Sequence, residues 1–251
     1  MKLNQQDMER YARQIALPEI GVAGQKKLLG ARVLVVGVGG LGSPAAYYLA
    51  AAGVGTLGLM DHDRVDISNL QRQILHGAKD VGRLKTESAA EKLRLQNPAV
   101  KLVLHAEKLT VKNGAGMVKQ YDFVVDACDT LESKSVMAGC CHAARTAYSY
   151  AAISAYCAQV MTVIPGQTAC YRCAFPSPVT APKGPVQGPL GVVPGIAGTL
   201  QAAEAIKHLL SLGRPLVNEM IVFDVTDMTF QRLRVAQNKD CPLCGKRAKK
   251  V

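Results

Sequence analysis

The sequence predicts an α/β fold, with a mainly parallel sheet covered by helices on both faces and an antiparallel extension near the C-terminal end. Two observations predict it. Short apolar runs alternate with amphipathic segments along the 251 residues, which is typical of α/β proteins. Residues 33–60 contain no charged side chain and break into strand, turn, helix, turn and strand. A buried βαβ unit explains this stretch better than a membrane span does.

The first half of the chain is expected to supply the start of the sheet. Residues 32–37 (RVLVVG) are apolar and predict a buried strand. The small-residue segment 42–53 predicts a helix, because Pro44 fits a first turn and Gly53 can end it. The other elements expected here are one or two helices at 4–29, a strand at 55–61, a helix at 83–97 and strands at 101–107 and 121–127.

The second half is expected to complete the sheet and then cross it. Residues 181–195 (APKGPVQGPLGVVPG) are rich in proline and glycine and predict a flexible crossing loop. A long helix should follow at 195–213 and close at Gly213. The remaining expected elements are a helix at 132–145, strands at 147–152 and 158–166, and two strands within 219–235.

Composition excludes several classes of protein. The formal charge of +11 includes four positive residues in the tail GKRAKKV, and the rest of the excess is spread along the chain. This charge could steer an acidic partner or phosphates, but no nucleic-acid motif accompanies it, so we do not expect a nucleic-acid ligand. The N-terminus has no apolar core typical of a signal peptide, and we expect a cytoplasmic protein without a membrane segment.

A phosphate-binding loop is predicted by Gly37, Gly39 and Gly42, which have the G-x-G-x-x-G spacing directly after a strand and at the start of a helix. Glycine lets the backbone turn sharply and approach a phosphate, and the helix N-terminus offers free N–H groups. Asp61 stands at the end of the next strand, where an acid can hold ribose hydroxyls. The pattern predicts a Rossmann-like nucleotide site without separating NAD, FAD and ATP.

Two C-x-x-C pairs predict a structural zinc site. Four thiolates can surround Zn²⁺ tetrahedrally even when the two pairs are far apart in sequence, and such a site leaves no open position for catalysis. Disulfides or a redox dithiol are the alternatives, and a cytosolic chain disfavours the disulfides. The expected role of the zinc is to hold the C-terminal part against the body of the protein. The four residues are Cys170, Cys173, Cys241 and Cys244.

Over nearly its whole length the chain resembles the ThiF/MoeB/HesA adenylyltransferases, which activate ubiquitin-like sulfur-carrier proteins and are related to ubiquitin-activating enzymes. Among Rossmann-like folds, the run SNLQRQ (68–73) and the paired C-x-x-C motifs are specific to this family. The other matching segments are RYARQI (10–15), GVGGLGS (37–43), DHDRVDISNLQRQILH (61–76), VGRLKTESA (81–89), DACD (126–129) and GTLQAAEAIK (198–207).

The resemblance implies a reaction. The C-terminal glycine carboxylate of a carrier ending in Gly-Gly would attack the α-phosphate of ATP, giving an acyl-adenylate and pyrophosphate, in sulfur transfer of the thiamine or molybdopterin type. Cations and Mg²⁺ would let the two anions meet. By resemblance, Asp61 holds the ribose, Gly40 joins the phosphate loop, Asn69, Arg72 and Gln73 line the triphosphate, Lys85 meets the phosphates, Asp129 holds Mg²⁺, and Arg13 reaches the ATP of the partner in a homodimer.

The resemblance also implies one domain over residues 1–251. Its expected parts are an N-terminal helical arm at 1–30, a nucleotide-binding core at 31–165, and a part at 166–251 that contains the crossing loop, the long helix and the zinc-bound C-terminus.

Three departures from the family pattern stand out. Asp129 is followed by Thr130 where the family has asparagine, and Lys134 replaces an arginine; both could weaken catalysis. The crossing loop lacks the cysteine that some members use for a persulfide or thioester, a position that falls at Gly184. We therefore expect the reaction to stop at the acyl-adenylate.

Two other functions stay open. The chain could be a nucleotide-binding scaffold that kept the fold and lost activity, or a nicotinamide-dependent oxidoreductase. The second would need an acid or base for hydride transfer, and the histidines at 105, 142 and 208 stand in helix or strand contexts instead. The sequence does not identify the carrier.

Overall fold

The structure is a computed structural model that describes residues 3–176 and 188–245, and its strands form one sheet in the order β3-β2-β1-β4-β5-β6-β7-β8. Neighbouring strands from β3 to β5 are parallel, and the pairs from β5 to β8 are antiparallel. The predicted sheet is thereby confirmed. The strands are β1 (Arg32–Val36), β2 (Thr56–Met60), β3 (Lys101–His105), β4 (Phe123–Asp126), β5 (Ala147–Ser154), β6 (Cys157–Val163), β7 (Glu219–Asp224) and β8 (Thr229–Arg234).

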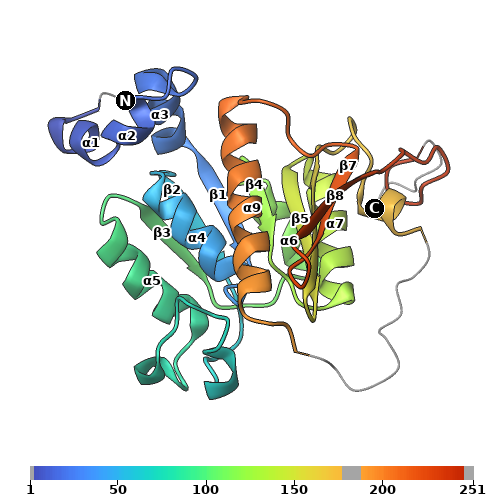
Figure 1. Ribbon diagram of the computed structural model, residues 1–251, viewed down its shortest axis with the longest axis horizontal. Coiled ribbons are helices and arrows are strands. Elements are labelled where there is room, and N and C mark those ends of the chain that lie inside the picture. Colours follow the sequence, from blue (N-terminus) through green and yellow to red (C-terminus); the bar gives the residue numbers. More distant parts are fainter. Residues whose placement is uncertain (1–2, 177–187, 246–251) are drawn as a thin grey trace.

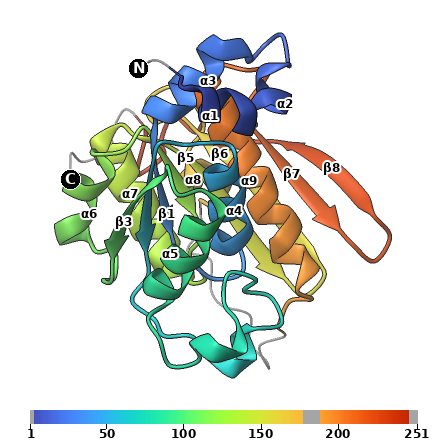
Figure 2. The ribbon, with the colours of Figure 1, turned by 90° about the vertical axis from the view of Figure 1, so that its left-hand side faces the viewer.

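Helices cover both faces of the sheet (Figures 1 and 2). The helices on one face are α4 (Gly42–Ala51), α5 (Lys85–Gln96) and α9 (Val192–Leu210), and those on the other are α6 (Val111–Val118) and α7 (Leu131–Ala144). The N-terminal helices are α1 (Gln5–Arg10), α2 (Ala12–Ile15) and α3 (Gly21–Gly30). Shorter turns of helix are η1 (Ile67–Asn69), η2 (Ala78–Asp80) and α8 (Tyr171–Ala174).

The core has two halves because side chains alternate along each strand. In β1, Val33 and Val35 pack in the half that contains α4 and α9, while Leu34 and Val36 pack in the half that contains α7. All four side chains are buried. Burial of each such side chain contributes roughly 1.5–3 kcal/mol before entropy is counted. The uncharged run in the sequence is therefore a strand covered on both faces.

The helices differ from the sequence prediction in three places. The N-terminal arm contains three helices, where one or two were expected. Helix α6 was missed, because its two glycines and β-branched valines are weak helix formers; packing of its buried Met117 and Val118 outweighs that propensity. Helix α9 begins at Val192, since Pro194 fits a first turn, and it ends at Leu210, before the left-handed Ser211.

The described helices include none long and apolar enough to span a membrane. Residues 177–187, which hold the first part of the predicted crossing loop (181–187) and with it Gly184, lie outside the described part of the chain, as does the basic tail from residue 246.

Candidate functional site

The candidate site lies at the carboxyl ends of the parallel strands, where β1 and β4 are neighbours. The chain leaves β1 toward β2 on one side and leaves β4 toward β5 on the other, so a crevice opens between the two connections. The two strand ends are in close contact: a Cβ built on Gly37 would lie 2.5 Å from the carbonyl oxygen of Ala127. Gly37 also has φ +94°, so glycine is required at this position.

The glycine loop, residues 37–42, then turns into α4. A Cβ at Gly42 would lie 1.9 Å from the carbonyl oxygen of Gly37, so this glycine serves close packing inside the turn. Gly39 differs, because its Cβ would meet only the Gln73 side chain at 3.4 Å. A Cβ at Gly40 would lie 3.1 Å from Pro194. The first and last glycines therefore shape the loop, while Gly39 and Gly40 face residues of the candidate site.

The glycine loop presents four backbone donors at the start of α4. Within residues 3–176 and 188–245, the N–H groups of Gly39, Gly40, Leu41 and Gly42 have no hydrogen-bond acceptor. The first N–H groups of a helix lack intrahelical partners and lie at the positive end of the helix dipole. This loop is therefore a preformed binding site for an anion such as phosphate.

Asp61 is buried at the end of β2 and holds the glycine loop. Its Oδ2 accepts a hydrogen bond from the N–H of Val38 at 2.8 Å, and its Oδ1 accepts one from the N–H of Asp63 at 2.9 Å. Each carboxylate oxygen has a second lone pair that can accept another donor. The acid is thus next to the glycine loop, as the sequence predicted, and it has a structural role there.

Arg72 and Gln73 lie against the two middle glycines. A Cβ at Gly40 would be 3.5 Å from Arg72 Cγ, and the Arg72 guanidinium donates to the carbonyl of Ser68 at 3.0 Å. Gln73 is buried, and its Oε1 has no partner among the described residues. A buried carboxamide with an unused polar atom beside free N–H groups fits a bound polar ligand.

Asn69 caps a turn. Its Oδ1 accepts a hydrogen bond from the N–H of Asp66 at 3.4 Å, and its carbonyl accepts from the N–H groups of Arg72 and Gln73. Asn69 therefore supports the segment that carries Arg72 and Gln73.

Lys85 begins helix α5 with a buried side chain, and its Nζ forms an ion pair with Asp63 Oδ2 at 2.8 Å. Burial acts to raise the pKa of Asp63, but the hydrogen bond and charge of Lys85 outweigh it, so this pKa is lowered overall. The ion pair thereby holds Lys85 Nζ beside the segment that follows β2. Half of the Asp63 side chain is exposed, so the pair can rearrange toward an anion.

Asp129 lies in the loop between β4 and α7, with an exposed side chain. The next residue, Thr130, caps α7, because its Oγ1 accepts a hydrogen bond from the N–H of Ser133 at 3.1 Å. Asparagine and threonine are both suited to an N-cap. The exchange of the family's asparagine for Thr130 therefore preserves the helix start that follows the acid.

Lys134 is buried and points away from solvent. Its Nζ lies 3.3 Å from Asp126 Oδ1 and 5.1 Å from the centre of the Tyr150 ring, and it donates to the carbonyl of Ala151. Complete burial raises the pKa of Asp126, although the charge of Lys134 acts in the opposite direction. The lysine that replaces the family's arginine thus joins α7 to β4 and β5.

Of the residues predicted for the nucleotide site, Arg13 is the one that the described structure places far from the glycine loop. It is exposed on α2, and the N-terminal arm packs at the amino ends of the strands, where Gly53 contacts Tyr11. The glycine loop is at the opposite end of the sheet (Figure 1). Arg13 therefore does not belong to the site of its own chain.

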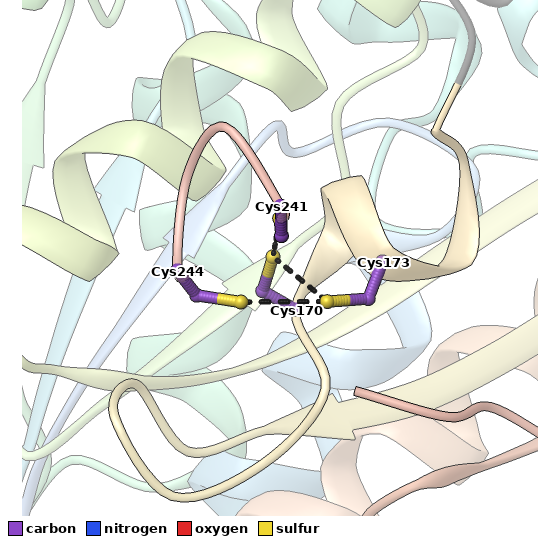
Figure 3. Close-up of side chains that lie close together, drawn as sticks. All are labelled: Cys170, Cys173, Cys241 and Cys244. Carbon is purple, nitrogen blue, oxygen red and sulfur yellow. Dashed lines mark hydrogen bonds between the residues drawn. The ribbon is translucent and has the colours of Figure 1, made fainter. Parts of the chain in front are cut away.

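The four predicted zinc ligands come together (Figure 3). Cys170 and Cys173 lie at α8, and the other two come from the loop after β8. The sulfur atoms of Cys170 and Cys241 are 3.5 Å apart, those of Cys173 and Cys244 are 3.4 Å apart, and all four lie within 4.8 Å of one another. A tetrahedron with Zn–S bonds of about 2.3 Å has S–S edges of about 3.8 Å, so the geometry fits zinc and excludes formed disulfides.

Two residues that support the site were not singled out from the sequence. Gln201 on α9 donates from Nε2 to the carbonyls of Asp126 and Ser149, which joins α9 to β4 and β5. The Nε2 atom of His76 forms a hydrogen bond with the carbonyl oxygen of Val38. The sequence does contain a signal for each of them: Gln201 is a polar residue in an apolar helix, and His76 ends a recognised motif. Their hydrogen-bond partners are distant in sequence, so the roles could not be inferred from it.

Comparison with known proteins agrees with this geometry. The model of the ThiF family matches residues 11–243, and the chain therefore belongs to the ThiF family. A sulfur carrier protein adenylyltransferase of Thermus thermophilus is 38% identical, with 98% of this chain and 93% of that protein covered. An adenylyltransferase and sulfurtransferase, MOCS3 of Sus scrofa, is 41% identical over 98% of this chain, which spans 55% of that longer protein.

Solved structures of MccB from E. coli have the same fold. One, with MccA-N7isoASN, superposes with a TM-score of 0.82 at 24% identity, covering 97% of this chain and 76% of that chain. Another, with ATP, has a TM-score of 0.75 at 25% identity, covering 88% of this chain and 68% of that chain.

Proposed function

We propose that this protein is an ATP-dependent adenylyltransferase that activates the C-terminal glycine carboxylate of a ubiquitin-like sulfur-carrier protein. The observation that carries the proposal is the glycine loop, whose free N–H groups lie beside Arg72 and Gln73. Membership of the ThiF family and the name of the Thermus thermophilus relative support this choice among nucleotide-binding functions.

In the proposed reaction, a carboxylate oxygen of the carrier forms a bond to the α-phosphorus of ATP. The bond from that phosphorus to the bridging oxygen breaks, and pyrophosphate leaves with the electron pair. The products are a carrier acyl-adenylate and pyrophosphate. Both reactants are anions, so they repel each other. Positive groups lower the activation barrier if they bind the phosphates more strongly in the transition state, where negative charge moves to the leaving pyrophosphate.

Five residues of the site have direct roles in that reaction. The N–H groups of Gly39 and Gly40 bind phosphate oxygens, and Arg72 offers a planar guanidinium suited to phosphate. Lys85 exchanges its ion pair with Asp63 for a phosphate contact. Asp61 holds the glycine loop and accepts a hydrogen bond from a ribose hydroxyl.

Asp129 would hold Mg²⁺ with its exposed carboxylate, since Mg²⁺ prefers oxygen ligands and is bound through one or two carboxylates and substrate phosphates. When bound, the metal ion would neutralise charge on the triphosphate. We expect Asp129→Ala to retain ATP binding and to form no adenylate. Full turnover by this variant would remove Asp129 from the metal role.

Arg13 would act on the partner protomer of a homodimer. Its place at the far end of its own sheet supports this reading. Mixing an Arg13→Ala chain with an Arg72→Ala chain gives mixed dimers in which one of the two sites keeps both arginines. Recovery of activity on mixing is expected; absence of recovery, or a monomer by sedimentation, contradicts the role in trans.

Zinc would bind the four cysteines as a structural ion. All four coordination positions would be taken by thiolates, so the ion would hold the loop after β8 against α8 and take no part in the chemistry.

We further propose that the reaction ends at the acyl-adenylate and that an external sulfur donor completes transfer. The absence of cysteine from residues 181–195 supports this. A covalent link between the carrier and any residue of this loop, detected by peptide mass spectrometry, would reject it.

The alternative, an inactive scaffold, is less well supported than activity. Thr130 and Lys134 have structural roles that explain their identities without loss of function. ATP–pyrophosphate exchange separates the two. We expect exchange to require a carrier ending in Gly-Gly, and to fall by about 10²–10³ in Arg72→Ala. The exposed Lys79→Ala is the control and should keep wild-type exchange. Exchange stimulated by no such carrier would favour the scaffold.

A further inference from the structure

His76 lies between the glycine loop and helix α5, and only 6% of its surface is exposed. Its Nε2 is 2.9 Å from the carbonyl oxygen of Val38, and its Nδ1 is 2.9 Å from the hydroxyl oxygen of Ser88. Val38 is the second residue of the glycine loop, and Ser88 is buried near the start of α5. The imidazole therefore joins the loop to the helix through both of its nitrogens.

The partners determine which nitrogen carries the proton. A carbonyl oxygen only accepts, so His76 Nε2 must donate to Val38. In the neutral ring Nδ1 is then an acceptor, and the hydroxyl of Ser88 donates to it. Lys92 Nζ donates to the same hydroxyl oxygen at 3.1 Å, so Ser88 Oγ both donates and accepts. Every polar atom of the neutral imidazole is satisfied.

The hydrogen bond from His76 Nε2 to the Val38 carbonyl fixes the direction of one peptide group. The peptide between Val38 and Gly39 is trans, so its carbonyl and its N–H point in opposite directions. Since the carbonyl is held toward His76, the N–H of Gly39 is held away from His76, and it has no acceptor among the described residues. On the other side of Val38, its own N–H donates a hydrogen bond to Asp61 Oδ2 at 2.8 Å.

The loop needs such a restraint. Turning over the peptide between Val38 and Gly39 changes ψ of Val38 and φ of Gly39, and glycine adopts either sign of φ at little cost, so this peptide could turn over without a restraint. A peptide turned over would present the Val38 carbonyl where the Gly39 N–H now points. An oxygen there would repel a phosphate that the N–H would bind.

We propose that His76 is a positioning residue for the nucleotide: by donating from Nε2 to the Val38 carbonyl, it holds the Gly39 N–H toward the phosphates of ATP. The role rests on the proposed function, because it requires that the glycine loop binds ATP. His76 does not touch the nucleotide, and it acts through Val38 and Gly39.

Two variants separate the two ring nitrogens. In His76→Gln the side-chain amide reaches the position of Nε2 and can still donate to Val38. In His76→Asn the amide reaches only the position of Nδ1, so the Val38 carbonyl loses its donor. Binding of ATP and of adenosine to each variant is measured by calorimetry in the absence of a carrier protein.

The expected result depends on the ligand. His76→Asn should bind ATP about tenfold more weakly than wild type, as expected for one misdirected donor to a charged group, while its affinity for adenosine is retained. His76→Gln should stay within about threefold of wild type for both ligands. Equal affinity of His76→Asn and wild type for ATP would overturn the role. Equal losses for ATP and adenosine would also overturn it, since they indicate general damage.

A measurement on the wild-type chain covers the case in which His76→Asn does not fold. The Gly39 amide should shift strongly in a proton–nitrogen NMR spectrum when ATP is added, and weakly when adenosine is added. If the Gly39 amide signal does not shift on addition of ATP while signals of other loop residues do, the proposed role of His76 is rejected and the proposed function is not. Failure of wild type to bind ATP at all would instead refute the proposed function.

Discussion

Lys134 Nζ lies 3.3 Å from Asp126 Oδ1, and both side chains are buried under α7. Asp126 Oδ2 has no partner among the described residues, so Lys134 is the main compensation for a carboxylate that burial disfavours. The pair joins α7, which Thr130 caps, to the strand that leads to Asp129. The loop that carries the proposed metal ligand is thus anchored at both of its ends.

Removing one member of this pair should destabilise the protein strongly. We expect Lys134→Ala to lower the free energy of unfolding by about 3–5 kcal/mol, because it leaves Asp126 buried and unpaired. Lys79→Ala is the control, since its pair with Glu91 is exposed and screened by solvent, so its loss should change the stability little. Urea unfolding measures both. Equal stability of the two variants would contradict the structural role of Lys134.

Two glycine variants should separate folding from binding. Gly37→Ala is expected to destabilise the chain, since its φ is +94° and the new Cβ would meet the Ala127 carbonyl at 2.5 Å. Gly39→Ala meets only Gln73 at 3.4 Å, so it should fold normally and bind ATP more weakly. Thermal unfolding and calorimetry test the pair. Unchanged ATP affinity in Gly39→Ala would contradict phosphate binding at this glycine.

Much of the sheet and of the site could be predicted from the sequence because the signals are local. The glycine loop, Asp61 and the cysteine pairs each follow from spacing within a few residues of a strand or turn. The contacts of Lys134 and His76 could not, since their partners are set by how α7 and the loop after β2 pack on the sheet. Helix α6 was missed for a related reason: its buried face, and not its composition, makes it a helix.

Metal removal should loosen the C-terminal part. We expect about one zinc per chain, released by a thiol reagent, and a lower melting temperature after its removal. Cys173→Ser should lose the metal. Cys157→Ser is the control, because Cys157 lies outside the cluster and a serine can still donate to Asp224. Wild-type zinc content in Cys173→Ser would contradict the site.

The stability of the protein should fall in mild acid, in part through His76. Burial, and after it the charge of Lys85, lower the pKa of His76 below its usual 6.5, although the hydrogen bond with the Val38 carbonyl and the charges of Asp61 and Asp80 act in the opposite direction. As pH falls below about 6.5, the unfolded chain takes up this proton before the folded chain does, so the free energy of unfolding decreases.

Urea unfolding of wild type and His76→Gln between about pH 7.5 and about pH 5.5 measures this contribution. The variant should lose less stability over this range than wild type does. The other histidines are unchanged in the variant, so the difference belongs to position 76. Identical pH dependence of the two proteins would show that His76 is not held neutral.

Intact-mass spectrometry of a Gly-Gly-ended carrier, incubated with this protein, ATP and Mg²⁺, tests the central claim most directly. The account predicts a carrier that gains the mass of AMP, matched by release of pyrophosphate, and no gain when the last glycine is deleted or Arg72 is replaced by alanine. A carrier that stays unmodified with wild-type protein, although ATP binds, would contradict it.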